Sequence, residues 1–444
     1  MHWGGGHFRS SRFSLVIVQP FLRTYRNGFL SLAMTSILTR NIAAQDALRS
    51  ALSLDRQLTS PQNTWVDLRP DQPHIGHVQL ALGAYTGAAY DDNVNTAETN
   101  AVSDFILQSG VNLGFYWPVT DQSELRFGSG VGYSYYLRNT HNSGVSVTPD
   151  SALAYSIVLE DASITAFDQF SYSRQVVTEG ALANLSVLPR LDNTVGFRGT
   201  WNPKQYAFEL GFSHDDFSSD SQEVTYLDRS SEYLFARAAW RAAKSTRYGF
   251  EASGSFTEYS SPTQSDNHST STGPFIEWQV RPALEVSIRG GPTLYFFDSH
   301  RRHPPAETLA SYYLGFGMDY QMTDYLSHHL NIERAVQPGL NLGSDYTEQL
   351  TVSYSFSWQL TQRLRVRAEF TYEDGSQPLA TIFGPFILLR TEQFEHYGGG
   401  PSVTWQFTDH LNATFNYSHW SRGSSIANRS YAENSVSFAV RYSF

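Results

Sequence analysis

The stretch Ser435-Val-Ser-Phe-Ala-Val-Arg-Tyr-Ser-Phe444 decides the fold class of this chain. Alternate positions in it differ in chemistry. One set is apolar or aromatic: Val436, Phe438, Val440, Tyr442 and Phe444. The other set is polar or small: Ser435, Ser437, Ala439, Arg441 and Ser443. Side chains alternate across a β-strand, so the stretch predicts a strand with one apolar and one polar face. A half-buried strand of a soluble protein shows the same alternation, so the rest of the chain has to decide between the two.

The composition suits a membrane protein that crosses with strands. The chain has 444 residues, no Cys and 14% aromatic residues, with a mean hydropathy of -0.35. No segment approaches the roughly 20 apolar residues that a membrane helix needs. Aromatic enrichment suits the girdles that barrels place at both membrane interfaces. A chain without Cys also fits an oxidising periplasm, because it has no disulfide to form.

Alternating strands recur from Val78 onward, and 349–360 is the clearest of them. On one side lie Leu350, Val352, Tyr354, Phe356, Trp358 and Leu360, and on the other only Gln, Thr and Ser. Segments 363–373 and 410–420 follow the same rule. A charge facing lipid near mid-bilayer costs roughly 2–4 kcal/mol. The charged faces of these strands are therefore expected to line an aqueous lumen.

A short motif repeats at one end of the hairpins. Segments 278–284, 320–326, 358–364 and 405–411 each hold an aromatic strand end, a short polar turn and the start of a new strand. Short turns alternate with longer loops rich in Ser, Asn and Asp, as in bacterial barrels with tight periplasmic turns. The recurring Trp or Tyr predicts a periplasmic aromatic girdle. A β-propeller also repeats about every forty residues, but its blades hold four strands, whereas each repeat here holds two long ones.

The hairpins predict an all-β fold, a transmembrane antiparallel up-and-down β-barrel of about 18 strands, with 16 possible. Barrels of that size leave an aqueous channel. The predicted strands are 77–91, 101–117, 123–138, 150–160, 162–173, 191–201, 205–216, 229–243, 247–260, 268–281, 284–297, 308–322, 325–336, 346–360, 363–375, 392–407, 410–421 and 431–444.

Two motifs resemble known families. The final strand resembles that of bacterial outer-membrane β-barrel proteins, which end in Phe with an aromatic or apolar residue two places earlier. The resemblance implies that Phe438, Val440, Tyr442 and Phe444 form the signal read by the barrel-assembly machinery. Tyr90-Asp-Asp-Asn-Val94 resembles the element that closes the first strand in the "porin 2" outer-membrane β-barrel family. Some members of that family accompany exopolysaccharide export genes, which makes polysaccharide export an expectation.

The N-terminal region predicts export. Five Arg and no acidic residue precede Gln45, and Gly28 to Leu38 form an apolar run after Arg23 and Arg26. A basic start followed by an apolar run is typical of a signal peptide. We expect 1–44 to hold a signal peptide behind an over-long start, 45–76 a periplasmic helix and linker, and 77–444 the barrel. A buried N-terminal helix is the alternative for the apolar run.

Charged residues on the polar strand faces are the candidates for solute selection. They are Arg126, Arg289, Arg363, Arg365, Arg367, Glu369 and Glu373, with Arg237 and Arg241 as further members. Facing rows of basic and acidic side chains create a transverse field that tunes selectivity. The alternative is plain solvation of the lumen with structural ion pairs.

Carboxylates at strand ends are the candidates for the rim. Asp91, Asp92, Asp215 and Asp216 are expected to bind divalent cations that bridge lipopolysaccharide, or to hydrate the rim. An enzyme is the rival interpretation, because Asp pairs beside His214 would activate water as in omptin-type proteases. No Ser-His-Asn set stands out for a lipase. The adjacent His328 and His329 face opposite sides of a strand, so they do not chelate one metal ion.

Two predicted outer loops, 174–190 and 376–390, are unusually apolar. A loop wholly in water does not keep so much apolar surface. One or both are therefore expected to fold into the mouth as a constriction or to pack on a partner. The alternative is that they extend the adjoining strands beyond the membrane.

The sequence thus predicts an outer-membrane porin-like channel for hydrophilic solutes, with polysaccharide export as one possibility, and no catalysis. The alternatives are a barrel enzyme of the omptin or lipase kind, and a structural or adhesive barrel without an open pore. The expected partners are outer-membrane lipid and lipopolysaccharide, the assembly machinery, and a hydrophilic solute or polysaccharide. No cofactor, metal or nucleic acid is expected.

Overall fold

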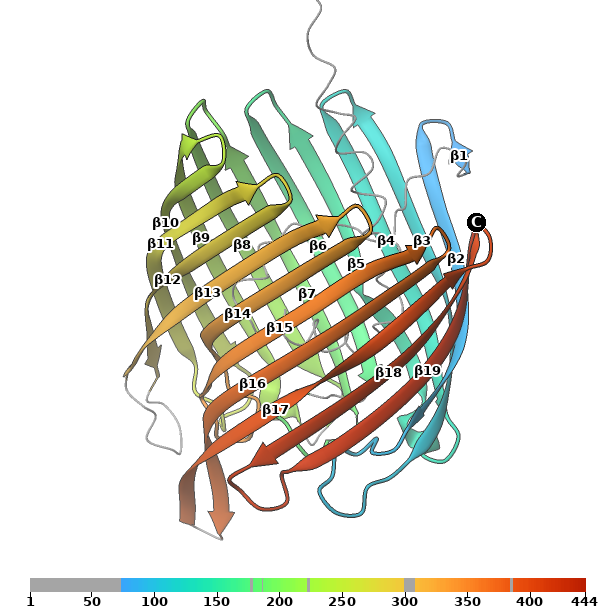
Figure 1. Cartoon of the computed structure of the whole chain (residues 1–444). Coiled ribbons are helices and arrows are strands. Elements are labelled where there is room, and N and C mark those ends of the chain that lie inside the picture. The colour runs from blue at the N-terminus through green and yellow to red at the C-terminus, as the bar shows by residue number, and fades with distance from the viewer. Residues whose placement is uncertain (1–72, 176–178, 186, 222–223, 299–307, 384–385) are drawn as a thin grey trace, which may run out of the picture.

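Each strand from β2 to β19 pairs antiparallel with the next in sequence order, and β19 pairs with β2 to close the sheet into a barrel. The computed structural model describes residues 73–444 except 176–178, 186, 222–223, 299–307 and 384–385. Within these residues eighteen strands form the wall, and Figure 1 shows them tilted around a central lumen. The predicted fold class is confirmed.

The strands alternate between tight turns and longer connections. Their bounds are β1 (His74–Ile75), β2 (Val78–Asp91), β3 (Asp104–Thr120), β4 (Ser123–Tyr136), β5 (Gly144–Val158), β6 (Ala162–Gln175), β7 (Leu188–Trp201), β8 (Tyr206–Ser219), β9 (Arg229–Ala243), β10 (Thr246–Tyr259), β11 (Asn267–Arg281), β12 (Leu284–Phe297), β13 (Thr308–Thr323), β14 (Leu326–Pro338), β15 (Tyr346–Thr361), β16 (Leu364–Phe383), β17 (Phe386–Gln406), β18 (Leu411–Ser424) and β19 (Tyr431–Ser443). Two 3-10 turns, η1 (Thr140–Asn142) and η2 (Thr225–Leu227), lie in connections, and β1 pairs only with β2. Every predicted strand is present.

The C-terminal strand closes the barrel, as its alternation predicts. β19 pairs with β2 from Ser435↔Asp91 to Ser443↔Gly83, and the amide of Phe444 donates to the carbonyl of Leu82 at 2.9 Å. Phe438 and Tyr442 lie on the outer surface with 51% and 43% of their area exposed. Arg441 lies on the opposite face of the strand, toward the lumen.

The outer surface is apolar and ends in an aromatic ring beside the tight turns. Phe250, in the middle of β10, is 68% exposed. Exposed aromatic residues occupy the tight-turn end of the wall: Trp117, Trp201, Tyr206, Trp240, Trp278, Tyr325, Trp358, Trp405 and Tyr442. Such an outer band suits lipid contact, and a closed barrel leaves no unpaired sheet edge in the bilayer. The protein is therefore placed in the bacterial outer membrane.

One of the two apolar loops is strand instead. β16 and β17 continue past the neighbouring strands and pair as far as Phe383↔Phe386, so 376–390 forms the tip of a long hairpin (Figure 1). For this segment the alternative expectation holds, because 376–390 extends the two adjoining strands and does not fold inward. The predicted signal peptide 1–44, and 45–72 of the predicted linker, lie outside the described residues. No helix among the described residues is long and apolar enough to cross a membrane.

Candidate functional site: the lumen and its inward segment

The second apolar loop enters the barrel. Residues 179–185 and 187, called here the inward segment, lie between β6 and β7. Their hydrogen-bond partners lie on β16, β18 and three outer connections, none of which neighbours β6 or β7 in the wall. The segment therefore crosses the outer half of the lumen, as predicted for 174–190.

Two backbone carbonyls of the inward segment hold it in place. The carbonyl of Ala181 accepts from Asn341 Nδ2 at 2.7 Å, Gln377 Nε2 at 2.9 Å and Arg429 Nη2 at 3.3 Å. The carbonyl of Gly180 accepts from Arg422 Nε at 2.7 Å. Charged donors strengthen such bonds in a buried setting. The segment is therefore anchored by side chains of β16 and β18 and of two outer connections.

Glu392 organises those anchors. Its carboxylate accepts from Arg422 Nη2 at 2.7 Å, Arg429 Nε at 2.9 Å and Gln377 Nε2 at 2.8 Å. The side chains of Glu392 and Arg422 are both 0% exposed. Burying a carboxylate costs free energy unless its charge is paired and hydrogen-bonded. The Glu392 carboxylate meets both conditions. We call Glu392, Arg422, Arg429, Gln377 and Asn341 the anchor network.

A second buried pair lies beside Gly180. His396 Nδ1 is 2.8 Å from Glu373 Oε2, both side chains are 0% exposed, and the His396 ring stacks on Trp420 with centroids 4.9 Å apart. A Cβ added to Gly180 would lie 2.5 Å from Glu373 Oε2 and 3.0 Å from His396 Cβ. A larger residue at this point of the inward segment would therefore have to displace this buried pair.

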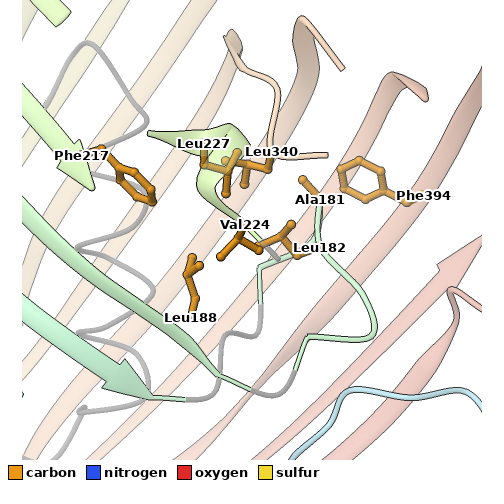
Figure 2. Close-up of a cluster of buried hydrophobic side chains, with 8 residues drawn as sticks. All are labelled: Ala181, Leu182, Leu188, Phe217, Val224, Leu227, Leu340 and Phe394. Carbon is orange, nitrogen blue, oxygen red and sulfur yellow. The ribbon is translucent and has the colours of Figure 1, made fainter. Parts of the chain in front are cut away.

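Two outer connections share a small apolar core with the segment (Figure 2). The core consists of Ala181, Leu182, Leu188, Phe217, Val224, Leu227, Leu340 and Phe394, all buried. Tyr226 packs against it, and burial raises the pKa of Tyr226, so its hydroxyl stays protonated and donates to the Leu340 carbonyl at 3.1 Å. This core holds the β8–β9 and β14–β15 connections against the inward segment.

The lumen wall carries alternating basic and acidic side chains. Arg126 pairs with Glu124 at 2.8 Å, Arg237 with Glu277 at 2.8 Å and Arg289 with Glu333 at 3.5 Å. Arg367 pairs with Glu369, and Arg365 Nε donates to Gln359 at 2.7 Å. Most predicted selectivity residues therefore do share the lumen. Arg363 does not join that row, because it lies exposed in the tight turn between β15 and β16. Glu373 belongs to the His396 pair near the inward segment.

The four predicted rim carboxylates lie on different faces of the barrel wall. Asp91 and Asp215 are 2% and 1% exposed and face inward, where Asp91 contacts Glu433 and Asp215 accepts from Thr194 at 2.6 Å. They are too buried to bridge lipopolysaccharide. Asp92 accepts twice from Asn434 at 2.7 Å, and Asp216 is outward and exposed. Outside the lumen only Asp92 and Asp216 of the four remain rim candidates.

The wall also separates the proposed catalytic groups. His214 lies on the outer face, 2.7 Å from Glu232 and 3.2 Å from Asp216, whereas Asp215 faces inward. An Asp pair split between two faces of a strand cannot activate one water. His328 and His329 divide in the same way, with His328 against Tyr354 and His329 against Asp319. No group of three metal-ligating side chains occurs among the described residues.

Among known proteins, this chain is similar in structure to several solved barrels. No protein-family model and no curated protein matches this chain. Three porin structures illustrate the structural similarity. Pseudomonas aeruginosa OccK2 (OpdF) in complex with glucuronate has 11% identity and a TM-score of 0.47, with 84% of this chain and 100% of that chain covered. P. aeruginosa OpdK with vanillate has 10% sequence identity and a TM-score of 0.43, with 82% of this chain and 99% of that chain covered. Acinetobacter baumannii OccAB3 has 10% sequence identity and a TM-score of 0.42, with 83% of this chain and 100% of that chain covered. Similarity of this degree carries no argument about the solute.

Proposed function

We propose that this chain is a passive outer-membrane channel for hydrophilic solutes, narrowed by the inward segment. The observation that carries the proposal is the pairing of an apolar outer surface with a lumen wall of ion pairs, such as Arg237–Glu277 and Arg289–Glu333. A polar interior of this kind suits water and hydrated solutes.

Selectivity would come from the inward segment and from charges near it. The segment reduces the cross-section, and rows such as Arg365 and Arg367 on β16 present a field to passing ions. Most of these Arg residues have an acidic partner. We therefore propose that the channel selects ions only weakly and has no fixed preference for anions or cations.

The test is single-channel recording of the purified full chain in planar bilayers. We expect discrete conductance steps, larger after deletion of 179–188. A barrel that gives no steps in either form would be structural or adhesive, and the channel proposal would be rejected. Equal steps in both forms would reject the constriction while the channel stands.

The solute itself is the finer part of the proposal. The resemblance of Tyr90-Asp-Asp-Asn-Val94 to the "porin 2" element supports an exported polysaccharide as one hydrophilic cargo. Titrating oligosaccharides of rising length into the same recordings tests this. Graded blockade by long chains supports it, and blockade only by small solutes contradicts it. Lipopolysaccharide at the rim, and the assembly machinery at Phe444, stay proposed partners.

A further inference from the structure

The barrel wall has a break between β13 and β14. The two strands pair from Thr323↔Leu326 only as far as Leu314↔Arg334, although β13 begins at Thr308 and β14 continues to Pro338. Their other edges stay paired, β12–β13 to Phe296↔Thr308 and β14–β15 to Pro338↔Tyr346. The backbone ladder is therefore missing over the outer part of the seam between β13 and β14, whereas the ladders on both flanks continue.

Side chains bridge the break in place of the ladder. Arg334 donates to the Tyr312 carbonyl at 2.6 Å and to Ser311 Oγ at 3.1 Å, and Ser311 donates to Glu348 at 2.6 Å. Arg334 also pairs with Glu348 at 3.0 Å and lies over the Tyr312 ring at 3.8 Å. Partly exposed ion pairs of this kind are weak, so the bridge itself opens more easily than a backbone ladder does.

The position of the break matches the outer edge of the membrane. Tyr313 lies about ten residues from the tight turn at Thr323, and a transmembrane strand needs about 9–11 residues to cross the apolar layer. Tyr312 is 53% exposed on the outer surface there. A molecule at this level has its apolar part in the outer leaflet and its polar part at the interface.

A cavity lies directly behind the break. A space of about 50 Å³ is lined by Tyr233, Phe235, Tyr295 and Tyr313, with Glu251 and Glu333 among the polar groups. Val336 and Ala335 of β14 form its side toward the break. Aromatic walls bind an apolar chain, and hydroxyls with Arg-paired carboxylates bind an uncharged polar head.

We infer that the β13–β14 break is a lateral portal through which a neutral amphipathic molecule, an alkyl chain with a hydroxyl head, passes between the outer leaflet and the lumen cavity. This goes beyond the proposed axial channel for hydrophilic solutes. Arg334 is the latch of the portal, and Tyr313 and Ala335 are the first residues on its two sides.

A reversible disulfide tests the portal. The native chain has no Cys, so Tyr313→Cys with Ala335→Cys adds one bond across the break. Ala335→Cys with Gln349→Cys is the matched control, because those residues are paired across β14–β15. Each full-length protein in lipid nanodiscs is exposed to decanol that carries a diazirine on its chain. After illumination, labelling at Tyr295 in the cavity is compared with labelling at Phe250 on the outer surface.

We expect Tyr295 to be labelled in the native chain, to lose its label when the Tyr313→Cys/Ala335→Cys bond is oxidised, and to regain it on reduction. The control should keep its label throughout. Arg334→Ala should raise labelling without any disulfide, which tests the latch even if the first bond fails to form. Equal labelling of Tyr295 in the oxidised and reduced forms would overturn the portal, as would labelling of Phe250 alone in the native chain. Conductance steps in the same variants report separately on the axial channel.

Discussion

Glu392 is the residue on which the constriction depends most. It is fully buried and serves two guanidinium groups that also hold the carbonyls of Gly180 and Ala181. Glu392→Gln keeps the shape of the side chain and removes its charge. Breaking a buried pair costs about 3–5 kcal/mol, because the remaining charge stays buried. We expect the inward segment to detach, with larger and noisier single-channel currents.

The control for this variant is Glu124→Gln. Glu124 pairs with Arg126 in the same lumen, but the Arg126 side chain is 42% exposed, and such a pair contributes about 0–1 kcal/mol. Its currents should match those of the native chain. Native-like currents from Glu392→Gln would show that the anchor network does not hold the segment.

Gly180 tests the same contact by size instead of charge. A Cβ at this position would meet Glu373, His396 and Phe394 within 3.1 Å. Gly180→Ala should therefore displace the segment and increase the current. Gly423→Ala is a matched control on β18, since nothing lies within 4 Å of its added Cβ. An increase in both variants would mean that glycine content, and not this contact, governs the current.

At the scale of elements, we expect the two apolar loops to differ in their effect on the single-channel current. The tip of the β16–β17 hairpin pairs with itself, Ile382↔Ile387 among others, whereas the inward segment hydrogen-bonds to the far wall. Deleting 379–389 should leave the single-channel current unchanged. A current that rises as much as after deletion of 179–188 would show that the hairpin tip also narrows the pore.

The strands were predictable from sequence, and the anchors of the inward segment were not. Alternation is a local property of a strand, so spans such as 229–243 and 284–297 agree with the structure to the residue. The contact of Ala181 with Gln377 joins positions 196 residues apart. It follows from the closure of the barrel and has no local pattern. Glu392 and Arg422 appear in the sequence as ordinary polar strand residues, and only barrel register brings them together.

Apolar content alone could not separate the two loops. Both 174–190 and 376–390 carry many apolar residues, but the second has Gly384-Pro385 at its centre, a dipeptide typical of a turn. That signal favoured a hairpin.

At the scale of the whole molecule, the barrel has an inside and an outside that share every strand. Phe250 faces lipid near the middle of β10, and Ser253, on the opposite face of the same strand, lines the lumen cavity. Phe250→Arg should lower the free energy of folding into lipid vesicles by about 2–4 kcal/mol, because the guanidinium would lie in the apolar layer. Ser253→Arg should cost much less, since its charge reaches water and Glu251. Urea titration of both variants in the same vesicles measures the difference. Equal losses of folding free energy in the two variants would mean that the alternation does not set which face meets lipid. The placement of charged side chains in the lumen would then be wrong as well.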